Sequence, residues 1–222
     1  LIVRDEHVNS REFYKFIKKS MKLIYKFDPL QHHGWFCIKE SDLKNYSENY
    51  LPSEVLKHSR IIFKYDENYF LSINLSDKVN YKSNFNKVVN SLTEKIESNW
   101  KPKNIYQLKS FMSQLMLLPA LYFSAKHSKG IYKRESFEII NKEFYDQWGV
   151  IEVATKIRAN WKYKLNFFQK FIMTQPNKIF RVLTKKIVAP KVPNLIAVEL
   201  DEKFYLKLKL LLSEMNRKVY KV

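Results

Sequence analysis

The densest group of side chains that could do chemistry is a short polar run in an apolar neighbourhood. It contains Asp28, followed closely by His32 and His33. A carboxylate with two imidazoles nearby suits a divalent metal ion, a general base or a contact with an anion. Adjacent side chains of a strand point to opposite faces, so both histidines could reach one metal ion only across a bend. The alternative is structural: Asp28 caps a turn and one histidine packs in the core.

Two basic segments could bind an anion. Lys133 and Arg134 lie between two expected helices, where they form either a rim for a phosphate group or a solvated loop. Arg158 and Trp161 lie in a second segment, in which neighbouring lysines surround a tryptophan that could stack on a base. An aromatic residue at helical spacing more often packs in the core, so packing is the first interpretation of Trp161. No Ser-His-Asp arrangement can be argued from the sequence.

Strands and helices must position these residues. Residues 1–3 are apolar and include two β-branched residues typical of a strand, and Asp28 is expected on a second strand after a helix over residues 9–26. Apolar runs at residues 61–63 and 69–73 flank a polar turn and predict a β-hairpin. From about residue 80 the apolar spacing is that of helices. The predicted fold class is α+β: a small mixed sheet with helices, followed by an α-helical bundle.

The change of spacing predicts two domains. Residues 1–78 form the α/β portion and residues 79–222 the bundle, with a linker near residues 189–194, where two prolines lie close together. Only 3 glycines are present in 222 residues, which argues against glycine-rich phosphate loops. The single cysteine excludes an internal disulfide and a cysteine-based zinc site.

The net charge of +18 is the strongest signal in the composition. Such a charge steers anionic ligands towards the protein and is typical of proteins that bind nucleic acid. The lysines are nevertheless spread along the chain, and the abundance of Lys, Asn, Tyr, Phe and Ile is also what an AT-rich genome produces. No apolar stretch is long enough to span a membrane, so we expect no membrane partner and a cytoplasmic location.

The order of elements resembles the latter part of a nucleotidyltransferase domain of the DNA polymerase beta superfamily. A strand ending in LIV (residues 1–3) precedes an amphipathic helix and then KFDPL (residues 26–30), where that family has the third carboxylate of its metal site. The runs LLPALY (residues 117–122) and GIYKRESF (residues 130–137) resemble the helical domain that follows the catalytic domain in many bacterial members. In those proteins the second run begins a helix near the active cleft.

The resemblance implies a nucleotidyltransferase, which transfers a nucleoside monophosphate from a nucleoside triphosphate to an acceptor. It implies two Mg²⁺ ions held by three carboxylates, of which Asp28 is one. It places His32, His33, Lys133 and Arg134 near the triphosphate or the acceptor, which could be a tRNA end or a small molecule. The Gly-Ser and Asp-x-Asp motifs of the family would precede residue 1, so we expect the chain as numbered to be truncated and inactive.

Two other functions fit the sequence. The chain could be a basic helical module that binds nucleic acid without catalysis, or an interaction protein whose helices pair with a partner. A nucleic-acid binder should lose affinity steeply as the salt concentration rises, because it releases counterions. A helix-pairing protein should instead form a dimer or hetero-complex with little salt dependence. The sequence leaves the oligomeric state open.

Overall fold

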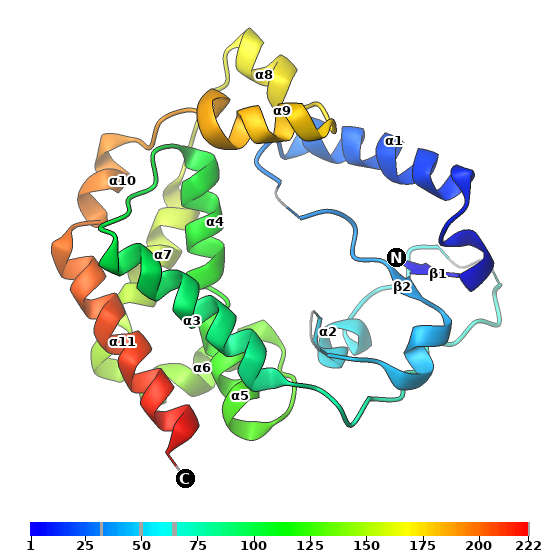
Figure 1. The fold of residues 1–222 in the computed structure, drawn as a ribbon, viewed down its shortest axis with the longest axis horizontal. Helices are drawn as coiled ribbons and strands as arrows, with labels where there is room; N and C mark the ends of the chain where they lie inside the picture. The colour runs from blue at the N-terminus through cyan, green and yellow to red at the C-terminus, as the bar shows by residue number, and fades with distance from the viewer. Residues whose placement is uncertain (32, 49–50, 64–65, 222) are drawn as a thin grey trace.

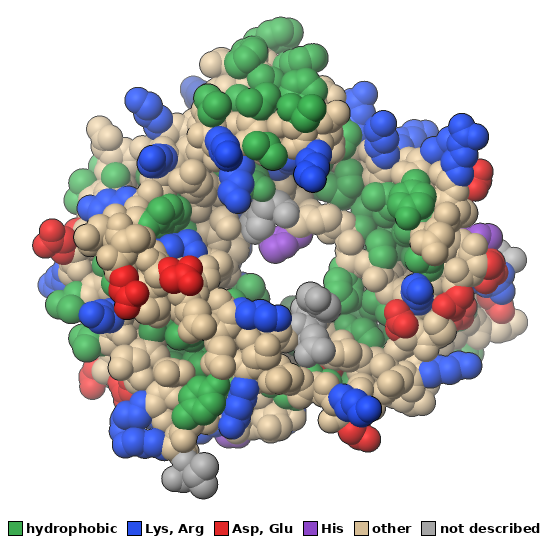
Figure 2. All heavy atoms as spheres, viewed as in Figure 1, with side chains coloured by type: hydrophobic (Ala, Val, Ile, Leu, Met, Phe, Trp, Pro, Cys, Tyr) green, Lys and Arg blue, Asp and Glu red, His purple; other side chains and the backbone are tan. Residues whose placement is uncertain are grey.

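A computed structural model describes residues 1–31, 33–48, 51–63 and 66–221. A small N-terminal unit and a helical bundle lie on either side of a central opening, and α1, α8 and α9 join them along one edge (Figure 1). The same opening is visible when all atoms are drawn (Figure 2). The described chain is mostly helical with one small sheet, in agreement with the coarse α+β prediction.

The N-terminal unit contains the sheet. β1 (Ile2–Val3) pairs in parallel with β2 (Ile38–Lys39). The connection between them is α1 (Arg11–Phe27), as a parallel pair requires a crossover. Its first turn is capped by the Ser10 hydroxyl, which accepts a hydrogen bond from the Phe13 amide. The described residues of the unit also form two 3-10 helices and one short α-helix: η1 (Asp5–His7), η2 (Ser41–Asn45) and α2 (Ser53–Lys57).

Several strand predictions are wrong. Asp28 follows the last turn of α1, where its amide donates to the Ile24 carbonyl, and the next strand begins only at Ile38. Pro29 lacks the amide hydrogen that a paired strand needs. The predicted hairpin is absent among the described residues of 61–73, where Ile62 and Phe63 are exposed, and residues 64–65 lie outside the described residues. The described sheet is purely parallel rather than mixed.

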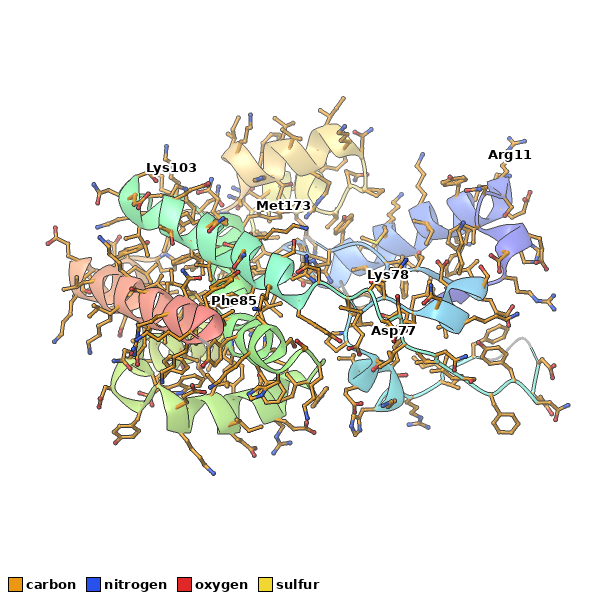
Figure 3. The ribbon with its side chains drawn as sticks, turned by 60° about the horizontal axis from the view of Figure 1, so that its bottom comes forward. Arg11, Asp77, Lys78, Phe85, Lys103 and Met173 are labelled. Atoms are coloured by element: carbon orange, nitrogen blue, oxygen red, sulfur yellow. The ribbon has the colours of Figure 1, made fainter. Side chains whose placement is uncertain are left out.

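The bundle has one main core. Its helices are α3 (Tyr81–Glu97), α4 (Ile105–Leu115), α5 (Leu118–His127), α6 (Lys133–Glu143), η3 (Tyr145–Gln147), α7 (Gly149–Asn160) and α11 (Glu202–Tyr220). Apolar residues at helical spacing give each α-helix a face that packs into this core, where Phe85, Leu108 and Ile140 are fully buried. In Figure 3, Phe85 marks α3 within the bundle, while Asp77 and Lys78 mark the connection that leads to it from the N-terminal unit.

A second, smaller core lies where the end of α1 meets the C-terminal half of the chain. It is enclosed by two short α-helices and a π-helix: α8 (Phe167–Met173), α9 (Lys178–Leu183) and η4 (Thr184–Val188). Leu30 is fully buried in it. Arg181 on α9 donates hydrogen bonds to the carbonyls of Pro29 and Gln31, at 3.1 and 2.6 Å, and lies 4.0 Å from the centre of the Tyr25 ring. This arginine therefore fixes the turn that carries Asp28.

The predicted linker near residues 189–194 leads into α10 (Asn194–Glu199). It is held to the bundle, because Lys191 forms a backbone bridge with Asn104. No helix in the described part of the chain is both long enough and apolar enough to cross a membrane.

Candidate anion-binding site

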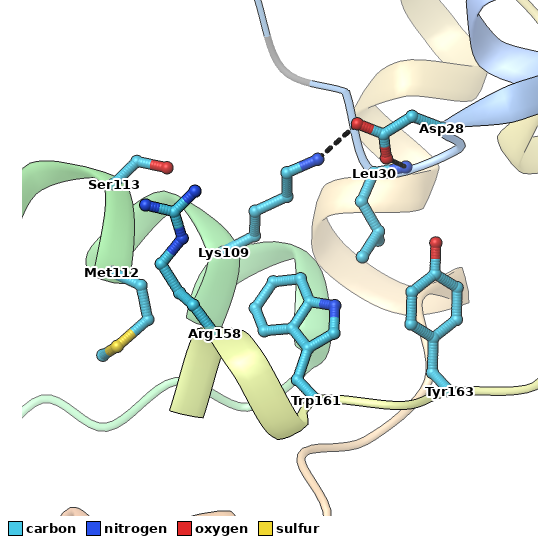
Figure 4. Close-up of a pocket in the computed structure, with 8 residues that line it drawn as sticks. All are labelled: Asp28, Leu30, Lys109, Met112, Ser113, Arg158, Trp161 and Tyr163. Atoms are coloured by element: carbon cyan, nitrogen blue, oxygen red, sulfur yellow. Dashed lines mark hydrogen bonds and ion pairs between the residues drawn. The ribbon is translucent and has the colours of Figure 1, made fainter. Parts of the chain in front are cut away.

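A pocket of about 190 Å³ lies between the end of α1, one face of α4 and the end of α7 (Figure 4). The residues that line it are Asp28, Leu30, Lys109, Met112, Ser113, Arg158, Trp161 and Tyr163. The volume is smaller than that of pockets that enclose a whole drug-sized ligand. The pocket can therefore hold part of a larger molecule, such as a phosphate chain or a single ring.

Local structure explains why these side chains meet. Lys109, Met112 and Ser113 are three and four residues apart, so they share one face of α4. α7 ends before Trp161, and the chain continues as an extended segment in which alternate side chains point the same way. Trp161 and Tyr163 accordingly pack inwards, while the lysines on either side of Tyr163 are exposed.

The carboxylate in the pocket already has partners. The Oδ2 atom of Asp28 lies 2.5 Å from the Nζ atom of Lys109, and its Oδ1 atom accepts a hydrogen bond from the Leu30 amide at 3.2 Å. Burial and the nearby Asp28 charge both raise the pKa of the Tyr163 hydroxyl. Asp28 thus caps a turn, as in the structural alternative drawn from the sequence, and it is also the counterion of Lys109.

Arg158 is the second cation of the pocket. It lies in the last turn of α7, where the helix dipole favours a positive charge, and Figure 4 shows its guanidinium group turned towards Ser113. Lys133 begins α6 nearby: burial, and then the charge of Arg158, lower the pKa of Lys133 to about 8. Among the described residues, neither cation forms an ion pair with a carboxylate. An anion bound here would relieve their repulsion.

The structure brings together only some of the residues that the sequence singled out. Asp28 lines the pocket with Arg158 and Trp161, and Lys133 is electrostatically coupled to Arg158. His33 is exposed and does not line the pocket, and the same is true of Arg134. The prediction for His32 lies outside the described residues.

Lys109 is a charged pocket residue to which no sequence pattern pointed. It is one of many lysines in the chain, and its position in the predicted helix is next to the apolar stripe rather than in a motif. Lys109 becomes the partner of Asp28 only because the fold brings the end of α1 close to α4. The segment of Arg158 and Trp161, by contrast, could be recognised as basic and aromatic from the sequence.

The described residues do not fit a centre for two Mg²⁺ ions. Asp28 is the only carboxylate among the described residues that line the pocket, and Lys109 occupies one of its oxygens. No group of three or more His, Cys, Asp or Glu side chains that could hold a metal ion occurs among the described residues. Hard cations such as Mg²⁺ require several oxygen ligands, so we derive no step through a metal ion.

A buried carboxylate outside the pocket positions the segment that leads to Lys133. Glu48 is 5% exposed and accepts hydrogen bonds from the Ser53 amide, the Tyr81 hydroxyl and the Gly130 amide. Burial alone would raise the pKa of Glu48, but the hydrogen bonds from Ser53, Tyr81 and Gly130 outweigh it and hold this pKa below its usual value. A Cβ atom at Gly130 would lie 2.8 Å from a Glu48 oxygen, so a larger residue here would have to displace the Glu48 carboxylate.

Comparisons with protein-family models, with curated proteins and with solved structures find no match to this chain. The function proposed below therefore rests on the geometry of the pocket and on the resemblance in the sequence.

Proposed function

We propose that the chain binds a nucleoside triphosphate at the Asp28 pocket, and that this binding serves nucleotidyl transfer to an acceptor. The observation that carries the proposal is the lining of the pocket, in which Lys109 and Arg158 lie beside Trp161. Ammonium and guanidinium groups bind phosphate oxygens, the latter in a bidentate manner. An indole ring stacks on a nucleobase.

The charge of the pocket supports an anionic ligand. Lys109 and Arg158 supply two positive charges against the single negative charge of Asp28, and Lys133 adds a third cation nearby. The net charge of +18 would speed the encounter with a triphosphate. Because the cavity is about 190 Å³, it would enclose one part of the nucleotide and leave the remainder in solvent.

The resemblance supports the type of reaction. In the family that this chain resembles, the helix that corresponds to α6 lies near the active cleft. In this chain α6 begins with Lys133, which is close enough to Arg158 for the two charges to interact. The acceptor, a tRNA end or a small molecule, belongs to the proposal through this resemblance alone.

The variant Asp28→Asn tests the proposal most sharply. If Asp28 is the counterion of Lys109, the variant frees that ammonium group, and ATP should bind about fivefold more tightly in the presence of EDTA. If Asp28 is a metal ligand, the variant should instead abolish whatever binding depends on Mg²⁺. Isothermal titration of ATP with and without Mg²⁺ separates the two roles. Absence of ATP binding under both conditions would refute the pocket as a nucleotide site.

A matched pair of arginine variants tests the place of binding. Arg158→Ala should weaken ATP binding about tenfold, because a charge-assisted contact with phosphate is lost. Arg11→Ala is the control: this exposed arginine begins α1, at the opposite end of the helix from Asp28 (Figure 3). Equal losses of ATP affinity in both variants would mean that binding depends on the net charge of the protein and not on the pocket.

A further inference from the structure

The segment formed by α8, α9 and η4 projects from the molecule with an apolar surface. Six of its exposed side chains define what we call the apolar tip: Phe167, Phe168, Phe171, Ile179, Val182 and Ile187, which are 44–88% exposed. Figure 2 shows a large group of hydrophobic side chains at the top of the molecule, over α8 and α9, with Lys and Arg side chains along its margin. Groups of this kind on a protein surface mark sites of interaction.

The chain around the apolar tip carries only positive charge. From residue 153 to residue 198 there is no Asp or Glu, although 22 acidic residues in 222 would place about four or five in a stretch of this length. The same stretch contains ten basic residues: Lys156, Arg158, Lys162, Lys164, Lys170, Lys178, Arg181, Lys185, Lys186 and Lys191. Lys170, Lys178, Lys185 and Lys186 are exposed on the tip segment itself. Its partner should therefore be both anionic and able to bury apolar side chains.

We propose that the apolar tip docks on the surface of an anionic lipid bilayer. Aromatic and aliphatic side chains can enter the boundary between headgroups and acyl chains, while lysines around them bind acidic headgroups. The two contributions act together, and each alone gives only weak, reversible binding. Docking of this kind needs no membrane-spanning helix, so it is compatible with the absence of such a helix from the described residues. It revises the expectation, drawn from the sequence, that the chain has no membrane partner.

The composition of the tip favours a bilayer over two other partners. A second copy of the chain would bring the exposed lysines of two tips together, and these like charges would repel. Single-stranded nucleic acid binds by stacking bases on aromatic rings, but Ile179, Val182 and Ile187 have no ring to offer. A lipid surface uses the aliphatic and the aromatic side chains alike.

Co-sedimentation with lipid vesicles tests the proposal on the full chain. Vesicles of phosphatidylcholine and phosphatidylserine in a 3:1 ratio should bind the protein at least about tenfold more tightly than pure phosphatidylcholine vesicles. The double variant Phe167→Ser with Ile187→Ser should lose about tenfold of this affinity. These side chains are 88% and 73% exposed, so the variant should keep its fold, which near-UV circular dichroism can verify.

A control variant removes two exposed apolar side chains elsewhere on the surface. Phe63→Ser with Phe70→Ser removes two side chains that are 85% and 83% exposed outside the tip, and vesicle binding should change less than twofold. The tip double variant should bind ATP as tightly as the wild type, because neither Phe167 nor Ile187 lines the Asp28 pocket, so failure of the nucleotide proposal and failure of this one are distinguishable. The proposal is overturned if acidic vesicles do not bind or if both double variants lose binding equally. It is also overturned if the tip variant keeps vesicle binding but no longer binds single-stranded RNA, or no longer forms a dimer that the wild type forms in sedimentation velocity.

Discussion

Lys133 shows how one residue can report on the ligand of the pocket. Burial and the charge of Arg158 lower its pKa to about 8, so its ammonium form is less favoured than that of a free lysine. A phosphate group bound beside these cations would favour the ammonium form again. Proton uptake by Lys133 should therefore accompany binding of an anion, whereas a neutral ligand should cause none.

The affinity for ATP should consequently depend on pH. Since Lys133 attracts an anion only while protonated, affinity should be constant well below pH 8 and fall as the pH rises through about 8. Titration calorimetry between pH 6.5 and 9.5, in buffers of different ionisation enthalpy, measures both the affinity and the protons taken up. Lys133→Ala should flatten the profile, and Lys133→Arg should extend the high affinity to higher pH. An unchanged profile in Lys133→Ala would separate this residue from the ligand.

At the scale of elements, the turn that follows α1 supplies Asp28 and Leu30 to the pocket. Periodic apolar residues predicted the helices of the bundle well, because each helix buries one face of its own. The same reasoning misplaced Asp28 on a strand, because the turn after α1 is held by Arg181, a residue far along the chain. A short run of mixed polar and apolar residues contains no periodicity that distinguishes a cap from a strand.

Arg181→Lys should loosen this turn without removing any side chain that lines the pocket. A guanidinium group can serve several carbonyls at once, but an ammonium group at this position cannot match its planar geometry or its contact with Tyr25. We expect a loss of about 1–3 kcal/mol in the free energy of unfolding, measured in urea, and a weaker affinity for ATP. Arg217→Lys is the control, because Arg217 lies on the surface of α11 in an exposed pair with Glu214. Equal destabilisation in both variants would contradict the role of Arg181.

At the scale of the whole molecule, the described residues form three hydrophobic cores, two of which share Trp161 at their margins. Polar links join the N-terminal unit to the rest: Asp28 with Lys109, 81 residues apart in sequence, and Glu48 with Gly130, 82 residues apart. Sequence patterns find cores because apolar spacing is local, but they cannot find such links because each partner looks ordinary in its own segment. This is why the helices of the bundle could be predicted from the sequence, and the pocket lined by α4, the end of α7 and the turn after α1 could not.

The link at Glu48 should make stability depend on pH. The pKa of Glu48 is lower in the folded state than in the unfolded state, so its ionised carboxylate stabilises the fold at a pH above the unfolded pKa. This stabilisation is lost as the pH falls through the pKa of the folded state. The free energy of unfolding of the wild type should therefore decrease as the pH falls below the usual range of glutamate, about 4.3. Glu48→Gln should be about 1–3 kcal/mol less stable at pH 7 and should show less of this decrease, as measured by urea unfolding at several pH values.

Glu54→Gln provides the matched control for this prediction. Glu54 is less buried and pairs with the exposed Lys57 on the same short helix, so its removal should change stability by less than about 1 kcal/mol. If Glu48 joins the two units, Gly130→Ala should reproduce the loss seen in Glu48→Gln, because a Cβ atom would displace the carboxylate from its hydrogen bonds with Tyr81 and Gly130. The two changes combined should then cost less than the sum of their separate effects, since both break the same link. Simple additivity in the double variant would mean that Glu48 and Gly130 act independently and that the units are held together by other contacts.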